Sequence, residues 1–389
     1  MRLAIVGPVH PLRGGIALHG ARLAAAARAR GHRVPIFSFC RLYPRVLFPG
    51  RTELDLGPPV ESLGEVEPDR SLDPLQPWTW PRVGRAITAA RADVVLLQRW
   101  HPFFAACLAT VAASPRRAGA RIVWMVHNAR PHEGTSLPWG KLLTLGMRPE
   151  DRILTHAPTE ARVLAELGVR AEVETLPMPV PGGVERADRA DARETLGIGP
   201  EEVVFLFFGY VRGYKGVDLL LEALAELPED GPPWRALVVG EWYVDRRPFE
   251  GAVARASRRG RVEVIDRYVA EDEVARYFAA ADAVALPYRA GTQSAVIALS
   301  YAHERGVIAT RVGGLEEAVV HGRTGLLAHP DTRSFATVLE DVRRGWRADP
   351  DALRRARDGA SFGALVERLE AFAPAPSRPA PLEFERGRG

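Results

Sequence analysis

Two cations, Arg212 and Lys215, lie in a glycine-punctuated loop directly before an expected helix. The buried-looking run 203–208 precedes them and ends at Gly209. Fixed cations at a strand end can stabilise the negative charge that develops on a diphosphate leaving group when a glycosidic bond breaks. Arginine binds phosphate oxygens in pairs, and lysine acts as a point charge. We interpret this loop as a candidate phosphate site; the alternative is a pair of solvated surface cations.

Two glycine pairs also follow buried-looking runs. Gly14 and Gly15 come after residues 2–7, and Gly313 and Gly314 come after residues 306–312. Paired glycines that open a helix let backbone N–H groups approach a phosphate or a sugar hydroxyl, and the helix dipole favours the negative group. The Gly14–Gly15 loop matches neither the dinucleotide-binding pattern nor the P-loop, and a plain strand-to-helix turn is its alternative. For Glu316 and Glu317, which follow the second pair, the alternative is helix N-terminal charge.

His127 directly follows five apolar residues, so we expect its side chain to emerge at a strand end. The segment 127–133 carries two histidines, an arginine and a glutamate. Such a group is well placed to line a cleft, because open α/β sheets bind ligands at the carboxyl ends of their strands. A histidine satisfied by backbone groups is the alternative.

The elements that must position these groups alternate between strand and helix along the chain, which predicts mostly parallel sheets. A Pro/Gly-rich, charged stretch at 177–189 is typical of a linker. We therefore predict an α/β protein with two tandem Rossmann-like, doubly wound domains that face each other across a cleft. The expected boundaries are 1–182 for an acceptor-side domain and 183–372 for a donor domain whose last helices may cross back. Residues 373–389 are expected to be disordered.

The length of the chain predicts two domains, or three, and its cysteine usage favours a reducing compartment. The chain has 389 residues, of which 47% are hydrophobic and 26% charged. Its two cysteines, Cys40 and Cys107, form no disulfide framework and no metal-binding spacing. No run is long enough to cross a bilayer, and the first apolar run is too short for a signal peptide. We expect a cytoplasmic location.

Short arginine clusters accompany the net charge of +4 and could contact anionic lipid headgroups at the inner face of a membrane. A solvated helix face is the alternative reading. The clusters are 246–247, 258–261 and 343–344. Arginine is spread along the chain, so we predict no nucleic-acid partner.

Segments 207–227 and 287–330 resemble the donor half of glycosyltransferase family 4, and 125–133 resembles its acceptor-side histidine segment. The resemblance covers most of residues 1–340 and is strongest from 203 to 330. It implies the GT-B fold and transfer of a sugar from a nucleotide diphosphate sugar with retention, with no bound metal and no cofactor besides the donor. The implied site residues are His127 near the donor sugar, Arg212 and Lys215 at the diphosphate, Gly14, Gly15 and Gly209 near the phosphate, Arg267 and Tyr268 at the nucleobase, Gly313 and Gly314 at the donor and Glu317 near the ribose.

The chain departs from the family at its usual pair of glutamates, which have seven residues between them. These positions align with Gly291 and Leu299, and a subgroup of the family is similar to this chain in carrying a Thr-Gln-Ser segment here. Hydroxyls and an amide can hydrogen-bond a phosphate or a sugar, but they cannot act as carboxylate bases. We therefore expect Thr292, Gln293 and Ser294, with the backbone N–H groups around them, to bind the donor.

The leading hypothesis is a retaining glycosyltransferase of the hexosyltransferase type. It would act in bacterial polysaccharide, glycolipid or natural-product glycosylation, on a sugar, lipid-linked or small-molecule acceptor. The missing carboxylates motivate a second hypothesis, a non-catalytic homologue that binds a nucleotide sugar or partners an active transferase. A nucleotide-sugar epimerase of the same fold is the third.

Overall fold

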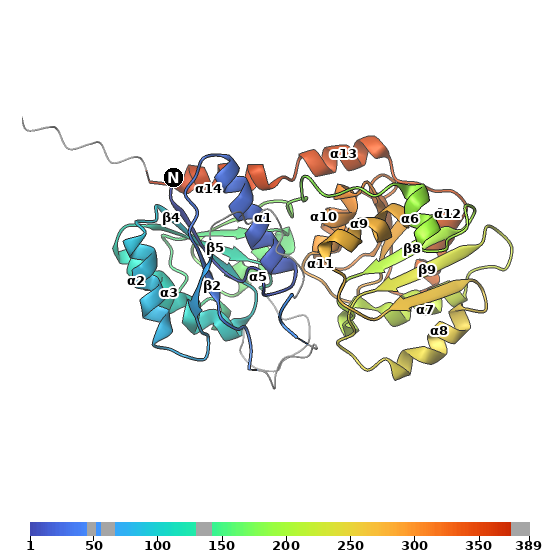
Figure 1. The fold of residues 1–389 in the computed structure, drawn as a ribbon, viewed down its shortest axis with the longest axis horizontal. Coiled ribbons are helices and arrows are strands. Elements are labelled where there is room, and N and C mark those ends of the chain that lie inside the picture. The colour runs from blue at the N-terminus through green and yellow to red at the C-terminus, as the bar shows by residue number, and fades with distance from the viewer. Residues whose placement is uncertain (45–51, 56–66, 130–141, 375–389) are drawn as a thin grey trace, which may run out of the picture.

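The computed structural model describes residues 1–44, 52–55, 67–129 and 142–374, and within them the chain forms two parallel sheets side by side (Figure 1). The N-terminal sheet has the order β3-β2-β1-β4-β5-β6-β7, and the C-terminal sheet has the order β10-β9-β8-β11-β12-β13. In each, the order reverses beside its first strand, at β1/β4 and at β8/β11. This is the topology of a doubly wound nucleotide-binding fold, which binds ligands at the switch point.

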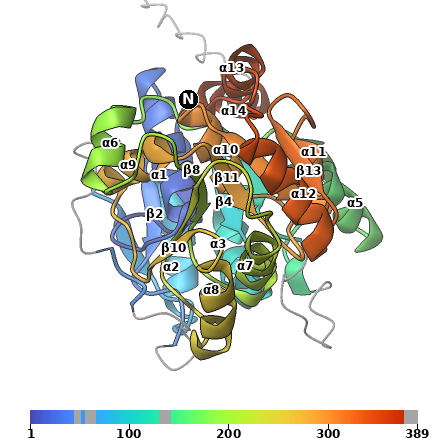
Figure 2. The same ribbon diagram turned by 90° about the vertical axis from the view of Figure 1, so that its right-hand side faces the viewer.

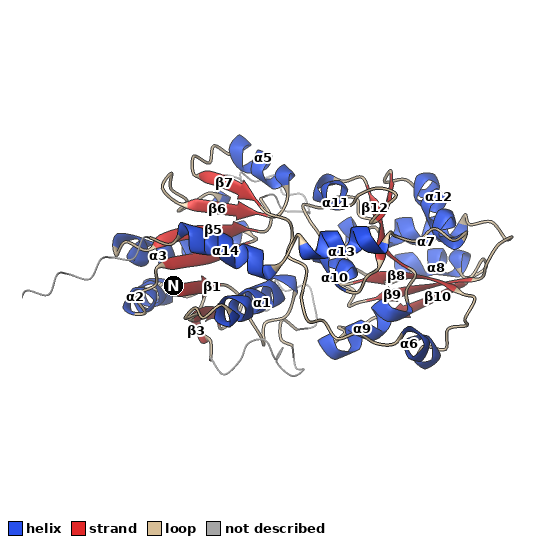
Figure 3. Ribbon diagram, turned by 90° about the horizontal axis from the view of Figure 1, so that it is seen from above, coloured by secondary structure: helices blue, strands red, loops and turns tan. Residues whose placement is uncertain are grey.

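The strands are short and mostly buried. The N-terminal sheet contains β1 (Leu3–Val6), β2 (Ile36–Phe39), β3 (Asp69–Leu72), β4 (Val94–Arg99), β5 (Arg121–Val126), β6 (Arg152–Thr155) and β7 (Glu172–Thr175). The C-terminal sheet contains β8 (Val203–Phe208), β9 (Trp234–Val239), β10 (Arg261–Ile265), β11 (Ala283–Leu286), β12 (Gly306–Thr310) and β13 (Gly325–Ala328). The central strands are apolar runs because helices cover both faces of each sheet (Figure 3).

Helices connect the strands and pack on both sides of the sheets. The first half carries α1 (Gly15–Ala29), α2 (Thr79–Ala89), η3 (Pro102–Phe104), α3 (Ala105–Arg117) and α5 (Pro158–Glu166). The second half carries α6 (Arg189–Thr195), η4 (Gly213–Lys215), α7 (Val217–Ala225), η5 (Arg247–Phe249), α8 (Glu250–Ala256), α9 (Glu271–Ala280), α10 (Ala295–Ala302), α11 (Gly313–Ala318), α12 (Thr332–Arg343), α13 (Pro350–Asp358) and α14 (Phe362–Phe372). The prediction of two Rossmann-like α/β domains is confirmed.

The chain crosses between the two halves twice, and the last helix packs on the N-terminal half. The two crossing segments meet where the Val180 N–H donates to the Ala360 carbonyl at 2.6 Å. Helix α14 then lies along α1, with Phe362, Val366 and Leu369 in the same apolar cluster as Leu3 (Figure 1). An end-on view shows the C-terminal half in front of the N-terminal half (Figure 2). Helix α14, which follows the second crossing, therefore links the C-terminal half to the N-terminal half at one side of the molecule.

Some elements differ from the sequence prediction. Strand β3 and the start of helix α2 lie in the stretch 41–82, whose residues carry little pattern, and β10 ends at Ile265 although the run 261–269 predicts one strand. The sequence after Asp331 predicts two helical stretches, whereas the described residues form three helices there, α12, α13 and α14. The expected disordered tail lies almost wholly outside the described residues. None of the described helices is both long and apolar enough to cross a membrane.

Candidate active site

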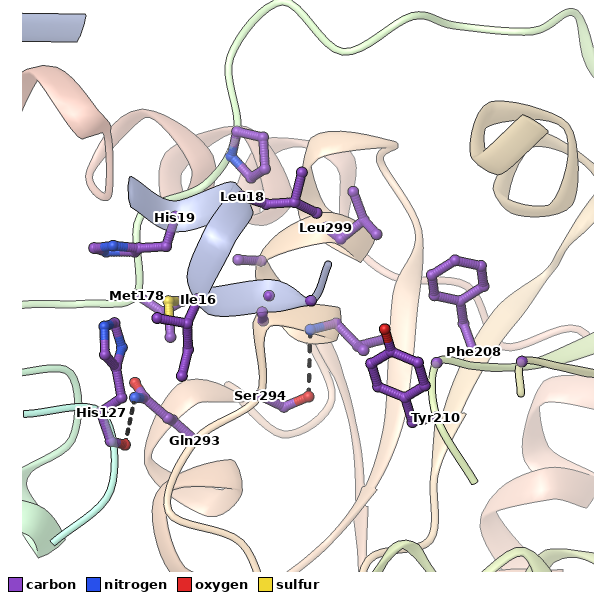
Figure 4. A pocket seen from close by; sticks show the side chains of 18 of the residues that line it. Ile16, Leu18, His19, His127, Met178, Phe208, Tyr210, Gln293, Ser294 and Leu299 are labelled. Atoms are coloured by element: carbon purple, nitrogen blue, oxygen red, sulfur yellow. Dashed lines mark hydrogen bonds between the residues drawn. The ribbon is translucent and has the colours of Figure 1, made fainter. Parts of the chain in front are cut away.

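A cavity of about 370 Å³ lies between the two domains, where the carboxyl ends of the two sheets face each other (Figure 4). Its walls come from the start of α1, the ends of β5, β8 and β9, the segment after β10 and the start of α10. The crossing segment near Met178 and Phe362 of α14 close one side. The predicted site residues that line the cavity are Gly14, Gly15, His127, Gly209, Lys215, Tyr268, Gln293 and Ser294.

Lys215 is a buried cation in the cavity wall. It ends the short helix η4 after β8, and its residue is 9% exposed. Its ammonium lies 5.6 Å from the centre of the Tyr288 ring. Burial, with a smaller contribution from Arg212, lowers the pKa of Lys215 from 10.5 to about 7. A phosphate bound beside Lys215 would favour the charged ammonium form and so raise its pKa.

Glycines give Lys215 its place. A Cβ at Gly209 would lie 3.2 Å from Lys215 Nζ. Gly216 has φ +65°, and a Cβ there would lie 2.0 Å from the Pro287 carbonyl oxygen. The loop can therefore close over the strand ends only with glycine at 216.

Arg212 starts the same loop but is not among the described residues that line the cavity. It is half-buried, and its guanidinium lies 5.0 Å from the centre of the Tyr243 ring. Arg212 thus lies three residues before Lys215 and contacts Tyr243, which is not among the cavity-lining residues either. It acts on the cavity through its charge, which contributes to lowering the Lys215 pKa.

The N-termini of α1 and α10 lie next to each other in the cavity wall. Ser294 caps α10, with its Oγ accepting a hydrogen bond from the Val296 N–H at 3.3 Å. A Cβ on Gly15 would lie 3.9 Å from the Ala295 side chain. Gly14 has φ +118°, a conformation that favours glycine. Two positive helix ends and the Lys215 ammonium thus converge on one space, which suits an anionic ligand.

His127 emerges at the end of β5 and is 4% exposed. Its Nε2 lies 3.1 Å from Gln98 Oε1, and burial lowers its pKa to about 3, so the ring is neutral near pH 7. Gln293 Nε2, from the other domain, donates to the His127 carbonyl oxygen at 2.9 Å (Figure 4). Thr292 Oγ1 donates to Asn128 Oδ1 at 2.8 Å, also across the cleft. The rest of the predicted segment, 130–133, lies outside the described residues.

Gln293 carries a buried acceptor with no partner among the described residues. Its amide nitrogen is used by His127, and its Oε1 makes no hydrogen bond there. A buried acceptor of this kind costs about 1–3 kcal/mol unless a donor reaches it. A hydroxyl of a bound ligand could supply that donor. The Tyr210 hydroxyl, on the same wall, is also buried without a partner in the described chain.

The two residues expected at the nucleobase are separated by the structure. Tyr268 lines the cavity, and its hydroxyl donates to Asp55 of the other domain at 3.0 Å. Arg267 is exposed and binds Glu273 through two hydrogen bonds of 2.7 and 2.5 Å. The carboxylate of Glu273 raises the Arg267 pKa. Only Tyr268 of this pair is in position to meet a ligand.

Gly313, Gly314 and Glu317 are not among the cavity-lining residues. A Cβ on Gly313 would lie 2.0 Å from the Gly291 carbonyl oxygen, and one on Gly314 would lie 1.8 Å from the Thr292 carbonyl oxygen. The two glycines therefore let α11 pack directly on the segment that precedes α10. Glu317 binds Arg162 of the N-terminal domain at 2.9 Å. The Gly313–Gly314 turn therefore packs on the segment before α10 and does not itself line the cavity.

The structure also adds residues that the sequence analysis did not single out. Arg13, next to Gly14, forms an ion pair with Glu241 of the other domain, and Glu241 lines the cavity. His19 lines it as well, one turn into α1. Glu241 closely follows strand β9, so a rule that collects polar residues at strand ends would have found it. His19 and Gln98 are read as ordinary core residues in the sequence.

Most of the arginines that were considered for lipid contact are paired with carboxylates. Arg247 binds Asp245, Arg261 binds Glu263 and Arg344 binds Glu340. Arg259 pairs with Glu229, and Arg343 is buried. Among the described residues, no group of three or more His, Cys, Asp or Glu side chains is arranged to hold a metal ion.

Models of known families match both halves of the chain. The model described as Glycosyltransferase Family 4 matches residues 13–181, and the model described as Glycosyl transferases group 1 matches residues 202–343. The two matches together contain every residue that lines the cavity except Phe362. The chain belongs to the group 1 glycosyltransferases of family 4. The resemblance that the sequence suggested is confirmed at this level.

Curated relatives of this chain include D-inositol 3-phosphate glycosyltransferases. That of Segniliparus rotundus is 34% identical over 182 residues, which is 46% of this chain and 40% of the relative. That of Acidothermus cellulolyticus is 29% identical over 379 residues, which is 86% of this chain and 80% of the relative. The chain spans about half the length of several of these relatives, with 56% for that of Thermomonospora curvata.

Solved structures show the same fold. A sucrose-phosphate synthase from Thermosynechococcus elongatus matches with a TM-score of 0.72 at 18% identity, over 95% of this chain and 98% of the other. HepE from Anabaena, in complex with UDP-glucose, also has a TM-score of 0.72 at 18% identity, over 95% of this chain and all of the other. The glycosyltransferase therefore has the GT-B architecture of two facing Rossmann-like domains.

Proposed function

We propose that this glycosyltransferase moves a sugar from a nucleotide diphosphate sugar to an acceptor hydroxyl, with retention of anomeric configuration and without a bound metal. The observation that carries the proposal is the position of Lys215. This buried cation, with its pKa lowered to about 7, lines the same interdomain cavity as the N-termini of α1 and α10. Such a set of groups matches a diphosphate better than any other common ligand.

In the proposed reaction the bond between the sugar C1 and the diphosphate oxygen breaks, and a bond from the acceptor oxygen to C1 forms. The acceptor proton moves to the departing phosphate oxygen, so atoms and charge balance. Lys215, with Arg212 behind it, stabilises the charge that develops on the diphosphate. The N–H groups at the start of α10, near Ser294, and those of Gly14 and Gly15 support the same oxygens.

The neutral ring of His127 supports a role in holding the sugar. The ring lines the cavity from the N-terminal domain, whereas Lys215 lines it from the C-terminal domain. Gln293 of the C-terminal domain donates a hydrogen bond to the His127 backbone carbonyl. The low pKa of His127 argues against a permanently charged imidazolium at this position. Gln293, with its free Oε1, is the second candidate for a sugar hydroxyl.

The nucleoside is assigned to the side of the cavity at Tyr268. Arg267 and Glu317, also proposed for the donor, are held by Glu273 and Arg162 in the present arrangement. They would have to leave these partners to reach a ligand. The proposal therefore relies on Tyr268 for the nucleobase, with Thr292, Gly209, Gly313 and Gly314 as supporting residues. The proteins named in the comparisons support a nucleotide-sugar donor, since HepE was solved with UDP-glucose.

The acceptor, the hexosyl specificity and the pathway are further parts of the proposal. Bacterial polysaccharide, glycolipid or natural-product glycosylation fits the family, and D-inositol 3-phosphate is the first acceptor to test because several relatives carry it in their names. Peripheral contact with a membrane stays a prediction, and the carboxylates that pair with the arginine clusters count against it.

A donor panel tests the proposal. The purified chain is incubated with UDP-, GDP-, ADP- and dTDP-linked hexoses, with and without acceptors, and released nucleotide and sugar products are measured. Release of nucleoside diphosphate together with a glycosylated acceptor supports transfer. Tight binding with no turnover across the panel indicates a non-catalytic binding protein, and a new sugar isomer without acceptor indicates an epimerase. Either of these two results would overturn the proposal.

A further inference from the structure

Gln98 lies at the end of β4 and is fully buried between His127 and helix α1. Glycines make its room: a Cβ at Gly7 would lie 2.4 Å from Gln98 Nε2, and a Cβ at Gly20 would lie 2.6 Å from the same atom. Because a buried side chain surrounded by backbone cannot move aside, any larger residue at these positions would displace the amide. The fold therefore holds the Gln98 amide in one place.

A chain of histidines next to Gln98 has a defined direction. His156 Nδ1 lies 3.1 Å from the Leu176 carbonyl oxygen, which can only accept, so this nitrogen carries the proton. His156 Nε2 is then an acceptor in the neutral ring, and His19 Nε2, 3.2 Å away, must donate to it. His19 Nδ1 is left as a bare acceptor. Burial lowers the pKa of His19 and His156, so both rings are neutral near pH 7.

The direction of this chain orients the Gln98 amide. The Gln98 side chain interacts with His19, and Gln98 Nε2 and His19 Nδ1 are both buried without a well-formed hydrogen bond in the described residues. A bare acceptor prefers the N–H side of an amide, which places Nε2 towards His19 and Oε1 towards His127. With Oε1 as acceptor at 3.1 Å, His127 Nε2 must carry the proton.

The other ring nitrogen of His127 is the one left for a ligand. Nδ1 makes no hydrogen bond to any residue that the structure describes, and His127 lines the cavity. The His19 and His127 rings lie 5.0 Å apart, on the same side of the cavity in Figure 4. We propose that Gln98 is a positioning residue that holds His127 in the Nε2–H form, so that Nδ1 accepts a hydrogen bond from a hydroxyl of the bound substrate.

This inference rests on the proposed function for its catalytic consequence, but the tautomer can be measured without activity. Nitrogen-15 NMR of the histidine rings in the full chain distinguishes protonated from bare ring nitrogens, and the His127→Asn variant identifies the His127 signals. We expect His127 to be protonated at Nε2 in the ligand-free protein. Protonation at Nδ1 would overturn the inference, whatever the enzyme does.

Two substitutions at the same position separate orientation from packing. Gln98→Met keeps the size but removes the acceptor, and we expect it to mix the two His127 tautomers and to lower kcat at least about tenfold, with donor KM changed less than about threefold. Gln98→Glu still offers an acceptor oxygen to His127 Nε2 but loses the amide N–H that faces His19, so His127 should keep its Nε2 proton and kcat should fall less than in Gln98→Met. A purely structural role would make both variants equally poor.

Thr88→Val is the matched control, because it removes a partly buried hydrogen bond to Ser114 in the same domain, away from the cavity. It should leave the His127 signals and kcat unchanged. A parent-like kcat in Gln98→Met, or equal losses in Gln98→Met and Gln98→Glu, would contradict the inference. If the parent enzyme turns over no donor in the panel, the proposed function fails, while the NMR result still decides the tautomer.

Discussion

Arg13 of the N-terminal domain and Glu241 of the C-terminal domain form a buried ion pair across the cleft. Arg13 Nη2 lies 2.7 Å from Glu241 Oε2, and the side chains are 5% and 2% exposed. The Arg13 guanidinium also lies 5.2 Å from the Tyr268 ring centre and 5.7 Å from that of Tyr210. A pair that is this well desolvated joins the two domains in the closed arrangement.

Breaking this pair should open the cleft. Glu241→Gln leaves the Arg13 charge buried without its counter-ion, a loss of about 3–5 kcal/mol for as long as the cleft stays closed. Because opening lets water reach Arg13, we expect a larger radius of gyration in small-angle X-ray scattering with little change in the unfolding midpoint. Glu316→Gln, which breaks the exposed pair with Arg311, is the control and should change neither. An unchanged radius of gyration in Glu241→Gln would contradict the idea that the Arg13–Glu241 pair keeps the cleft closed.

The low pKa of Lys215 predicts proton uptake when a nucleotide binds. Its folded pKa of about 7 leaves the amine mostly neutral at pH 8, and a bound diphosphate raises that pKa. Binding should therefore take up a proton at pH 8, and affinity should fall as the pH rises above about 7. Titration calorimetry with UDP in Tris and in HEPES buffer measures the proton count. Lys215→Arg, always protonated, should show no uptake, and equal observed heats for the parent in the two buffers would refute the idea.

Removal of either loop cation should slow the reaction. We expect Lys215→Ala and Arg212→Ala each to lower turnover at least about tenfold, because each removes charge that stabilises the leaving diphosphate. Steady-state nucleotide release with the donor found in the panel measures the effect. Arg247→Ala, which removes an exposed arginine paired with Asp245, is the control and should keep parent rates. Parent rates in both loop variants would rule out the diphosphate assignment.

Gly216 should tolerate no side chain. Gly216→Ala forces a Cβ to 2.0 Å from the Pro287 carbonyl oxygen at φ +65°, so we expect the free energy of unfolding to fall by at least about 2 kcal/mol. Gly213→Ala, in the same loop, meets nothing within 4 Å and should stay within about 0.5 kcal/mol of the parent. Denaturant titrations of both variants provide the comparison. Equal stability of the two would show that the loop adapts.

Restoring the family's first glutamate should harm this chain. A Cβ at Gly291 would lie 2.8 Å from Cδ1 of Leu315, whose side chain is fully buried. Gly291→Glu should therefore lower the free energy of unfolding by about 1–3 kcal/mol through overpacking. We expect a lower unfolding midpoint and no gain in turnover. Adding Leu315→Ala should recover part of the stability, since it removes the clashing methyl. A Gly291→Glu variant that is as stable as the parent and faster would show that the packing around position 291 can accommodate a glutamate.

Much of the fold could be predicted because parallel strands buried on both faces are apolar runs between amphipathic helices. Strand β3 was missed because its residues Asp69–Leu72 are exposed except for the last, so no apolar pattern marks them. Helix α2 was missed because it lies in a stretch rich in proline and charge, and it is held by packing on α3.

The candidate site was partly predictable for a related reason. His127 directly follows an apolar run, and Lys215 and Ser294 lie in the loops after β8 and β11; the carboxyl ends of parallel strands meet at one edge. Gln98 and Arg13 were not found, because their importance comes from partners that are distant in sequence, His127 and Glu241. Glu317 was expected at the ribose and instead lies against Arg162, since the pairing of exposed helix charges depends on how α11 packs on α5.

The sequence by itself determined the two α/β domains, the family and the residue types available at the strand ends, because these follow from periodicity and from local glycine and charge spacing. The tertiary structure alone decided which of these groups share a cavity, that burial lowers the pKa of Lys215 and that His127 Nε2 lies within hydrogen-bond distance of Gln98. Protonation and hydrogen-bond direction depend on desolvation and on neighbours from other parts of the chain, and only the packed fold supplies both.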